Sequence, residues 1–198
     1  MGSFIKKKQV LVLLLSAALL PAGSLAAAAE GWYVENGEWY YEDRYGEPVR
    51  ADVSPDGWLL SVSGAWERTE FDHLVGAYEL AGERLSGSSE FTEPRPEQDG
   101  SVHSAYISLT REKNISVRET WAYPNGHVLR TCSADYARYG DTFYQLYEKV
   151  RNYNQELEPD RQFSDNASRL TDNGDGTVTL TFEEQGGITG LLFRKKAD

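Results

Sequence analysis

The stretch that decides the fold is residues 177–194, TVTLTFEEQGGITGLLFR. From Thr177 to Phe182, polar and apolar residues alternate with a period of two, which is typical of a strand with one buried face. Gln185-Gly186-Gly187 then supplies a turn, and Ile188 to Arg194 returns as a second strand. This stretch therefore predicts an antiparallel hairpin.

Further strand-like segments lie upstream of this hairpin, at residues 74–80, 105–109, 115–121, 128–136 and 142–149. Pro124-Asn125-Gly126 and Tyr139-Gly140-Asp141 supply turns between them, and a short helix over 142–154 is the alternative to the last strand. Residues 84–100 and 152–165 are polar and predict exposed excursions. Some eight short strands with tight turns predict a mainly β chain whose residues 70–198 close into an antiparallel barrel, since closure removes exposed strand edges.

The first of these strands carries a spaced pattern, Leu74-x-Gly76-x-Tyr78-x-Leu80, and the last ends in Arg194. This combination resembles the lipocalin-like (calycin) families, whose first strand reads L-x-G-x-W-x-L and whose last strand carries an Arg or Lys that covers that ring. The resemblance implies that Tyr78 and Arg194 close one end of the barrel. A barrel of about eight strands either holds one small apolar ligand or is filled by its own side chains.

An aromatic-rich stretch, Trp32 to Trp66, precedes the barrel and holds four of the five tryptophans. Turn sequences recur through it every eight to ten residues, at Asn36-Gly37, Tyr45-Gly46, Pro55-Asp56-Gly57 and Ser63-Gly64. Residues 30–68 are therefore predicted to form short stacked β-hairpins, which need a neighbour to pack on because a single hairpin is marginal in water.

Four short matches, at Gly31-Trp32, Trp39-Tyr40-Tyr41, Tyr45-Gly46 and Gly57-Trp58, resemble the cell-wall-binding repeats (choline-binding type) of Gram-positive surface proteins. In that family, aromatic rings form a box that attracts a quaternary ammonium by cation–π interaction. The resemblance implies ligand-binding roles for Trp32, Trp39, Tyr41, Trp58 and Trp66. The partner would be a cell-wall polymer, recognised through its choline groups or its glycan. The alternative is that these rings only pack on one another or on the barrel, and the low copy number, about one and a half repeats, favours it.

The first 29 residues have the order of a secretory signal. Lys6-Lys7-Lys8 precede an apolar run from Val10 to Leu20, and small residues follow, so cleavage is expected between Ala26 and Glu30. The run is shorter than the roughly 20 residues of a membrane span. A secreted or wall-associated protein with no transmembrane anchor is expected.

The charge composition further narrows the range of possible binding partners. All 31 acidic residues follow residue 29, whereas three of the 20 basic residues precede it, so the remainder carries a net charge of about −14. Nucleic acid is excluded as a partner, because phosphate contacts need clustered Lys and Arg. Cys132 is the single cysteine and permits no internal disulfide; a buried small residue in a strand is favoured over a redox site.

The chain offers little for catalysis. His73, His103 and His127 have no metal-ligand spacing, and no nucleophile elbow occurs. The loop 172–177 is predicted to be a β-turn rather than a calcium site, because glycines stand where oxygen ligands are needed. No catalytic residue, metal or cofactor is expected. The predicted function is an exported, cell-envelope-associated, non-enzymatic protein, and the alternatives are a pure interaction module with a filled barrel and, less favoured, a wall-associated hydrolase.

Overall fold

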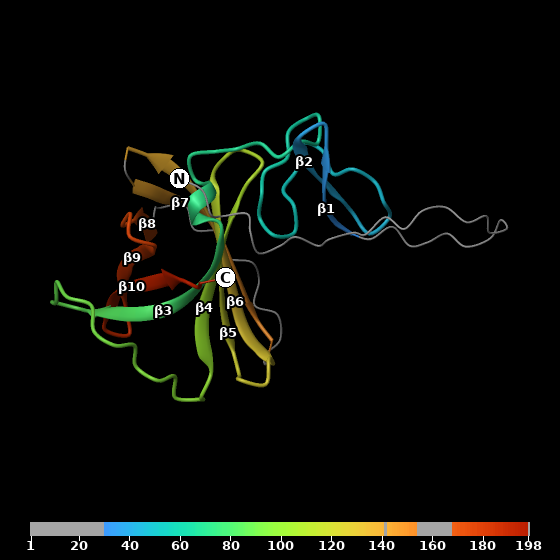
Figure 1. Ribbon diagram of the computed structural model, residues 1–198. Coiled ribbons are helices and arrows are strands. Elements are labelled where there is room, and N and C mark those ends of the chain that lie inside the picture. Colours follow the sequence, from blue (N-terminus) through green and yellow to red (C-terminus); the bar gives the residue numbers. More distant parts are fainter. Residues whose placement is uncertain (1–29, 141, 154–167, 198) are drawn as a thin grey trace.

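The computed structural model describes residues 30–140, 142–153 and 168–197 and is mainly β (Figure 1). The predicted antiparallel barrel is confirmed: eight strands close on themselves in the order β10-β3-β4-β5-β6-β7-β8-β9. The strands are β3 (Gly76–Leu85), β4 (Val102–Leu109), β5 (Ile115–Ala122), β6 (Val128–Tyr139), β7 (Thr142–Asn152), β8 (Ser168–Asp172), β9 (Thr177–Gln185) and β10 (Ile188–Lys195). Within the described ranges no helix is long and apolar enough to cross a membrane.

The barrel is a meander in which each strand pairs with its neighbours in the chain, and β10 returns to pair with β3. Alternation along the strands decides which side chains point inward. In β4, for example, His103, Ala105, Ile107 and Leu109 are buried, and the residues between them are partly exposed. Most of each strand therefore contributes every second residue to the interior, and β-bulges interrupt this alternation in β3, β7 and β10.

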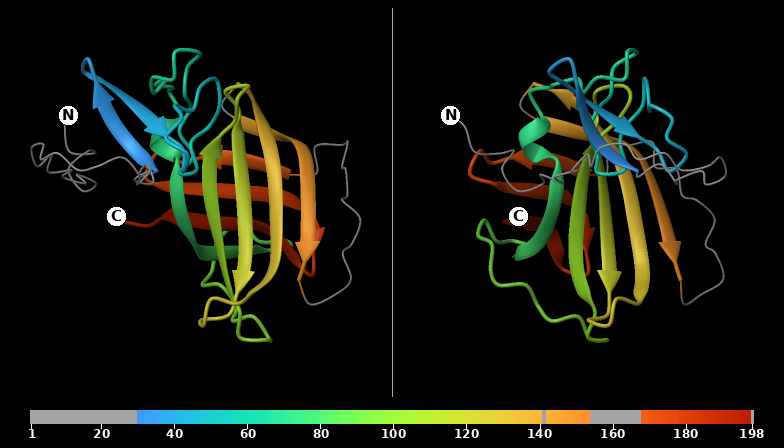
Figure 2. Two further views of the ribbon diagram at one scale, coloured as in Figure 1. Left: turned by 90° about the vertical axis from the view of Figure 1, so that its right-hand side faces the viewer. Right: turned by 45° about the vertical axis from the view of Figure 1, so that its right-hand side comes forward.

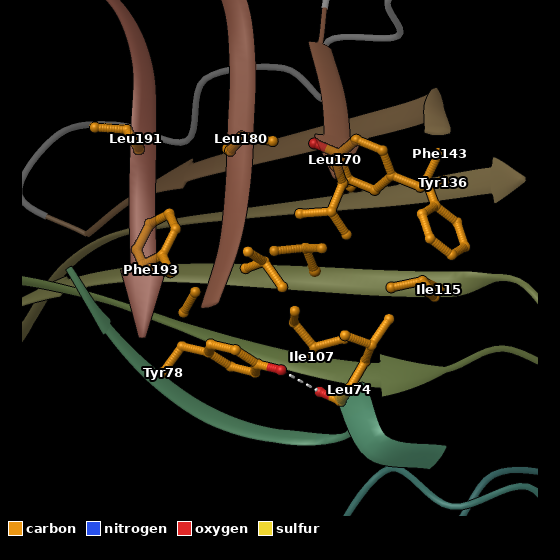
Figure 3. Packing of buried hydrophobic residues seen from close by; sticks show 14 residues of the cluster. Leu74, Tyr78, Ile107, Ile115, Tyr136, Phe143, Leu170, Leu180, Leu191 and Phe193 are labelled. Atoms are coloured by element: carbon orange, nitrogen blue, oxygen red, sulfur yellow. Dashed lines mark hydrogen bonds between the residues drawn. The ribbon is translucent and has the colours of Figure 1, made fainter. Parts of the chain in front are cut away.

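Side chains fill much of the interior (Figure 3). The core comprises Leu74, Tyr78, Ala105, Ile107, Ile115, Val117, Ala134, Tyr136, Phe143, Leu170, Val178, Leu180, Leu191 and Phe193. Tyr78 is only 1% exposed, and its hydroxyl donates a hydrogen bond of 2.9 Å to the carbonyl of Leu74. This contact ties the short 3-10 helix η1 (Asp72–Leu74) to the start of β3 and helps to close that end of the barrel.

Several segment boundaries differ from those expected. Residues 142–152 are a strand, which decides against the helix alternative, because Phe143, Gln145 and Val150 alternate with more exposed neighbours. The first barrel strand starts at Gly76 and runs on to Leu85, into the segment predicted as a loop. The polar excursion 152–165 lies mostly outside the described residues, as does the predicted signal.

The aromatic segment contains one regular hairpin, β1 (Gly31–Glu35) with β2 (Glu38–Glu42). Its turn is Asn36-Gly37, with φ of 51° and 85°, the left-handed values that an Asn-Gly hairpin turn adopts. Each of the three remaining predicted turns is closed by a backbone hydrogen bond, which the amide of Gly46, Gly57 or Gly64 donates to the carbonyl three residues earlier. Isolated bridges, such as Tyr40 with Ala65, link these turns in place of the additional hairpins that were expected.

The aromatic segment packs against one end of the barrel, opposite the β5–β6 turn (Figure 2). The amide of Leu109 donates to the carbonyl of Gly57 at 3.0 Å, and the hydroxyl of Tyr106 donates to the carbonyl of Asp56 at 2.6 Å. Leu59 also shares a small apolar cluster with Val75 and Leu109. We call this end of the barrel the covered end and the opposite end the mouth.

Candidate functional site

The aromatic positions predicted to bind ligand do not form one box. Trp32 and Tyr41 meet edge to face with ring centroids 5.4 Å apart, and Trp58 and Trp66 form a second such pair at 5.5 Å. No ring contact joins the two pairs in the described part of the chain. Trp39, the fifth position, lies beside Trp66, since the amide of Trp66 donates to the carbonyl of Trp39 at 2.7 Å.

The first pair is held by its own polar groups. The indole N–H of Trp32 donates to Asp56 at 3.0 Å, and the hydroxyl of Tyr41 donates to Glu30 at 3.1 Å. Burial raises the pKa of Tyr41 to about 12, and the hydrogen bond to Glu30 adds to the shift. These rings are therefore engaged in packing and internal hydrogen bonds.

A hollow of about 260 Å³ opens beside the second pair, lined by Gly37, Glu38, Trp39, Trp66 and Arg68. The β1–β2 turn supplies one side of it, and the segment after the Ser63-Gly64 turn supplies the other. The Arg68 guanidinium lies 4.9 Å from the centre of the Trp66 ring, as in a cation–π contact. We call this hollow the aromatic hollow.

The two tryptophans of the aromatic hollow differ in their partners. Trp39 is half-buried, lines the hollow and has no ring or cation contact among the described residues. The Nε1–H of Trp66 is buried and has no acceptor in the part of the chain that the structure describes. An unpaired buried donor costs about 1–3 kcal/mol, so a ligand oxygen that reached it would recover part of that energy.

The structure does not bring Tyr78 and Arg194 together. Phe193 points into the core, so the next residue, Arg194, points outward and is exposed. The residue of β10 that is paired with Tyr78 is Lys195, whose Nζ donates to the carbonyl of His73 at 2.6 Å. Lys195, rather than Arg194, thus links β10 to the residues before β3 at the covered end.

A set of polar side chains lies inside the barrel toward the mouth. His103 is 7% exposed, and its Nε2 lies 2.7 Å from the Glu119 carboxylate. The thiol of Cys132, also buried as predicted, donates to Glu148 at 3.0 Å. Burial and the charges of Glu119 and Glu148 raise the pKa of Cys132 well above its ordinary value. Cys132 is therefore a neutral thiol at physiological pH and a poor nucleophile.

Three more interior polar groups lie closer to the covered end, since Tyr136 is paired with Ile115. The Tyr136 hydroxyl lies 2.8 Å from Ser168 Oγ, which in turn donates to Gln145 Oε1. Gln145 is 5% exposed, and its Nε2 has no partner in the described structure. Burial raises the pKa of Tyr136 far above its ordinary range, so its hydroxyl stays neutral.

Of these interior polar residues only Cys132 was predicted to be buried. None of them was predicted to form a polar set with the others. The inward position of His103 could have been predicted from the alternation of β4, which places His103 on the same face as Ala105 and Ile107. No group of three or more His, Cys, Asp or Glu side chains among the described residues is arranged to hold a metal ion.

Comparison with known proteins gives no relative: no family model, curated protein or solved structure matches the chain.

Proposed function

We propose that this chain is an exported, cell-envelope-associated, non-enzymatic binding protein that contacts a wall glycan through the aromatic hollow. The observation that carries the proposal is the 260 Å³ hollow itself, bounded by two tryptophans, a carboxylate and a guanidinium. The signal-like order of residues 1–29 and the resemblance of the segment to wall-binding repeats support the same function.

The contacts favour glycan over choline as the occupant. Arg68 already lies over the Trp66 ring, in the place that a quaternary ammonium would take in an aromatic box. A second cation there would be repelled by the guanidinium. A sugar ring can instead stack on the Trp39 ring that lines the hollow while its hydroxyls bond to Glu38 and Arg68.

The barrel supports the proposal as a scaffold. Its interior holds fourteen buried core residues among those described. An apolar ligand inside the barrel therefore has less support than glycan binding at the aromatic hollow. The hydrolase alternative also has less support. The interior carboxylates of Glu119 and Glu148 are engaged by His103 and Cys132, and the Trp121 ring stacks on His103 with centroids 4.1 Å apart.

Cosedimentation with purified insoluble wall glycan tests the proposal. We expect the mature protein to sediment with the glycan and Trp39→Ala to remain in the supernatant. Tyr45→Ala is the matched control, because Tyr45 is a 71% exposed ring of the same segment away from the hollow. Equal sedimentation of Trp39→Ala and Tyr45→Ala would contradict the proposal, and release of the bound protein by choline alone would favour an ammonium site instead.

A further inference from the structure

A second hollow, of about 310 Å³, lies at the mouth of the barrel, at the opposite end from the aromatic segment. The end of β5, the start of β6, the end of β7 and the loop before β4 meet there (Figure 2). Its lining residues are Glu97, Asp99, Ser101, Trp121, Leu129, Arg130 and Asn152. The volume is at the lower limit of small-molecule pockets, which typically start near 300 Å³. We call this hollow the mouth hollow.

Opposite charges line the mouth hollow without neutralising each other. The Arg130 guanidinium lies 4.8 Å from the centre of the Trp121 ring and has no ion-pair partner among the described residues. Stacking uses the face of a guanidinium and leaves its N–H donors in the plane free for a carboxylate. Glu97 and Asp99 line the same hollow. The Ser101 amide donates to Asp99 at 2.9 Å and lowers the pKa of Asp99, which keeps this carboxylate ionised.

The wall that carries Arg130 is held in place from inside the barrel. The Trp121 ring is stacked on His103 at 15° between planes, and His103 is in turn bonded to Glu119. Trp121 and Leu129 give the hollow an apolar wall, and the side-chain amide of Asn152 adds a neutral donor and acceptor. Such a supported wall is preorganised, which lowers the entropic cost of binding.

We propose that the mouth hollow binds a small zwitterion of the α-amino-acid class. The ligand carboxylate pairs with Arg130, its ammonium group lies toward Glu97 and Asp99, and its side chain lies along Trp121 and Leu129. A simple cation or a simple anion would satisfy one charge of the lining and be repelled by the other. This site is separate from the aromatic hollow and does not depend on glycan binding.

Titration of the mature protein with L-leucine, followed by the NMR signals of the tryptophan indole N–H groups, tests the charge requirement. N-acetyl-leucine lacks the ammonium group and leucine amide lacks the carboxylate, so each is a matched probe of one charge. We expect leucine to shift the Trp121 signal in the millimolar range, about 1 mM corresponding to a binding free energy near −4 kcal/mol, and each blocked analogue to bind at least about tenfold more weakly. Absence of any shift up to about 10 mM, or equal binding of the three compounds, overturns the proposal.

Two arginine variants test the placement. We expect Arg130→Gln to weaken leucine binding at least about tenfold, because it removes the bidentate partner of the carboxylate. Arg151→Gln is the matched control, since Arg151 is an exposed arginine of neighbouring β7 that does not line the hollow. Unchanged binding in Arg130→Gln overturns the assignment, as does an equal loss in both variants. The analogue series on the unmodified protein decides the question if Arg130→Gln does not fold.

Discussion

Along β5 the inward residues change from Ile115 and Val117, near the covered end, to Glu119 and Trp121 at the mouth. The same strand geometry therefore supplies an apolar core at one end and a polar set at the other. At the covered end the aromatic segment and η1 exclude water, so burial there contributes most to stability. At the mouth the buried groups are polar and paired, and such pairs contribute little net stability because their desolvation opposes their attraction. The covered end therefore stabilises the fold more than the mouth does.

The largest expected effect comes from truncating one ring at each end. Phe143→Ala should lower the free energy of unfolding by about 3–5 kcal/mol, because Phe143 is 3% exposed within the core and meets Phe71 at 5.2 Å. Trp121→Ala should cost less than about 2 kcal/mol, although the ring is larger, because it is only half-buried. Urea unfolding of both variants measures the difference, and equal losses would remove the contrast between the two ends.

One glycine at each end of the barrel allows the two ends to be compared through backbone substitutions. Gly57 has φ of 92°, and a Cβ there would lie 2.8 Å from the Cβ of Ser108 on β4. Gly126, in the turn at the mouth, has φ of 87° and open space around it. Both Ala variants carry the left-handed strain of about 1–2 kcal/mol, and only Gly57→Ala should add a clash, for a total loss of at least about 2 kcal/mol. Thermal unfolding that ranks the two variants equally would show that the aromatic segment can shift off β4 without cost.

The buried thiol of Cys132, one of the polar residues toward the mouth, predicts that the protein loses folding stability at alkaline pH. Below the unfolded pKa of about 8.5 the thiol is neutral in both states, and above it only the unfolded chain ionises Cys132. Stability should therefore fall as pH rises, by about 1–1.5 kcal/mol at a pH about one unit above that value. Cys132→Ala should show a flatter decline than the unmodified protein when unfolding is measured between about pH 7.5 and 9.5. Parallel declines would mean that the thiol is solvated.

The smallest expected effect is the loss of one hydrogen bond at the covered end. Tyr106→Phe removes the donor to the Asp56 carbonyl while keeping the ring, and should cost about 0.5–1.5 kcal/mol. Tyr139→Phe is the control, because Tyr139 is 81% exposed. Loss of its hydroxyl should leave the free energy of unfolding unchanged. A Tyr106→Phe variant as stable as this control would indicate that the aromatic segment is held by its apolar contacts alone.

Local patterns allowed the strands and turns to be predicted from the sequence. Asn36-Gly37 and the alternation from Thr177 to Phe182 report on backbone geometry within a few residues, and both form as expected. The run Leu191-Leu192-Phe193 was less informative, because three consecutive apolar residues do not show which of them face inward. Arg194 was assigned to the barrel end by the lipocalin-like resemblance of the last strand, whereas the pairing with Tyr78 falls on Lys195.

The polar set at the mouth could not be predicted in the same way, because it depends on the register between strands. His103 meets Glu119 across β4 and β5, and Cys132 meets Glu148 across β6 and β7. A bulge between Asp135 and Tyr136 also shifts the pairing of β6 with β7. A one-residue shift in register would separate these pairs, and composition alone does not specify the register.

The pairing of β10 with β3 also governs how this protein acquires its fold. The two strands that close the barrel, Gly76–Leu85 and Ile188–Lys195, are the first and the last of the eight, so closure joins segments about a hundred residues apart. Native contacts at such separation slow folding, because the entropy of the intervening chain is lost before they form. During synthesis from the N-terminus, β3 therefore emerges first and has no β10 to pair with until the last strand follows. The topology thus delays barrel closure until the last strand has been made.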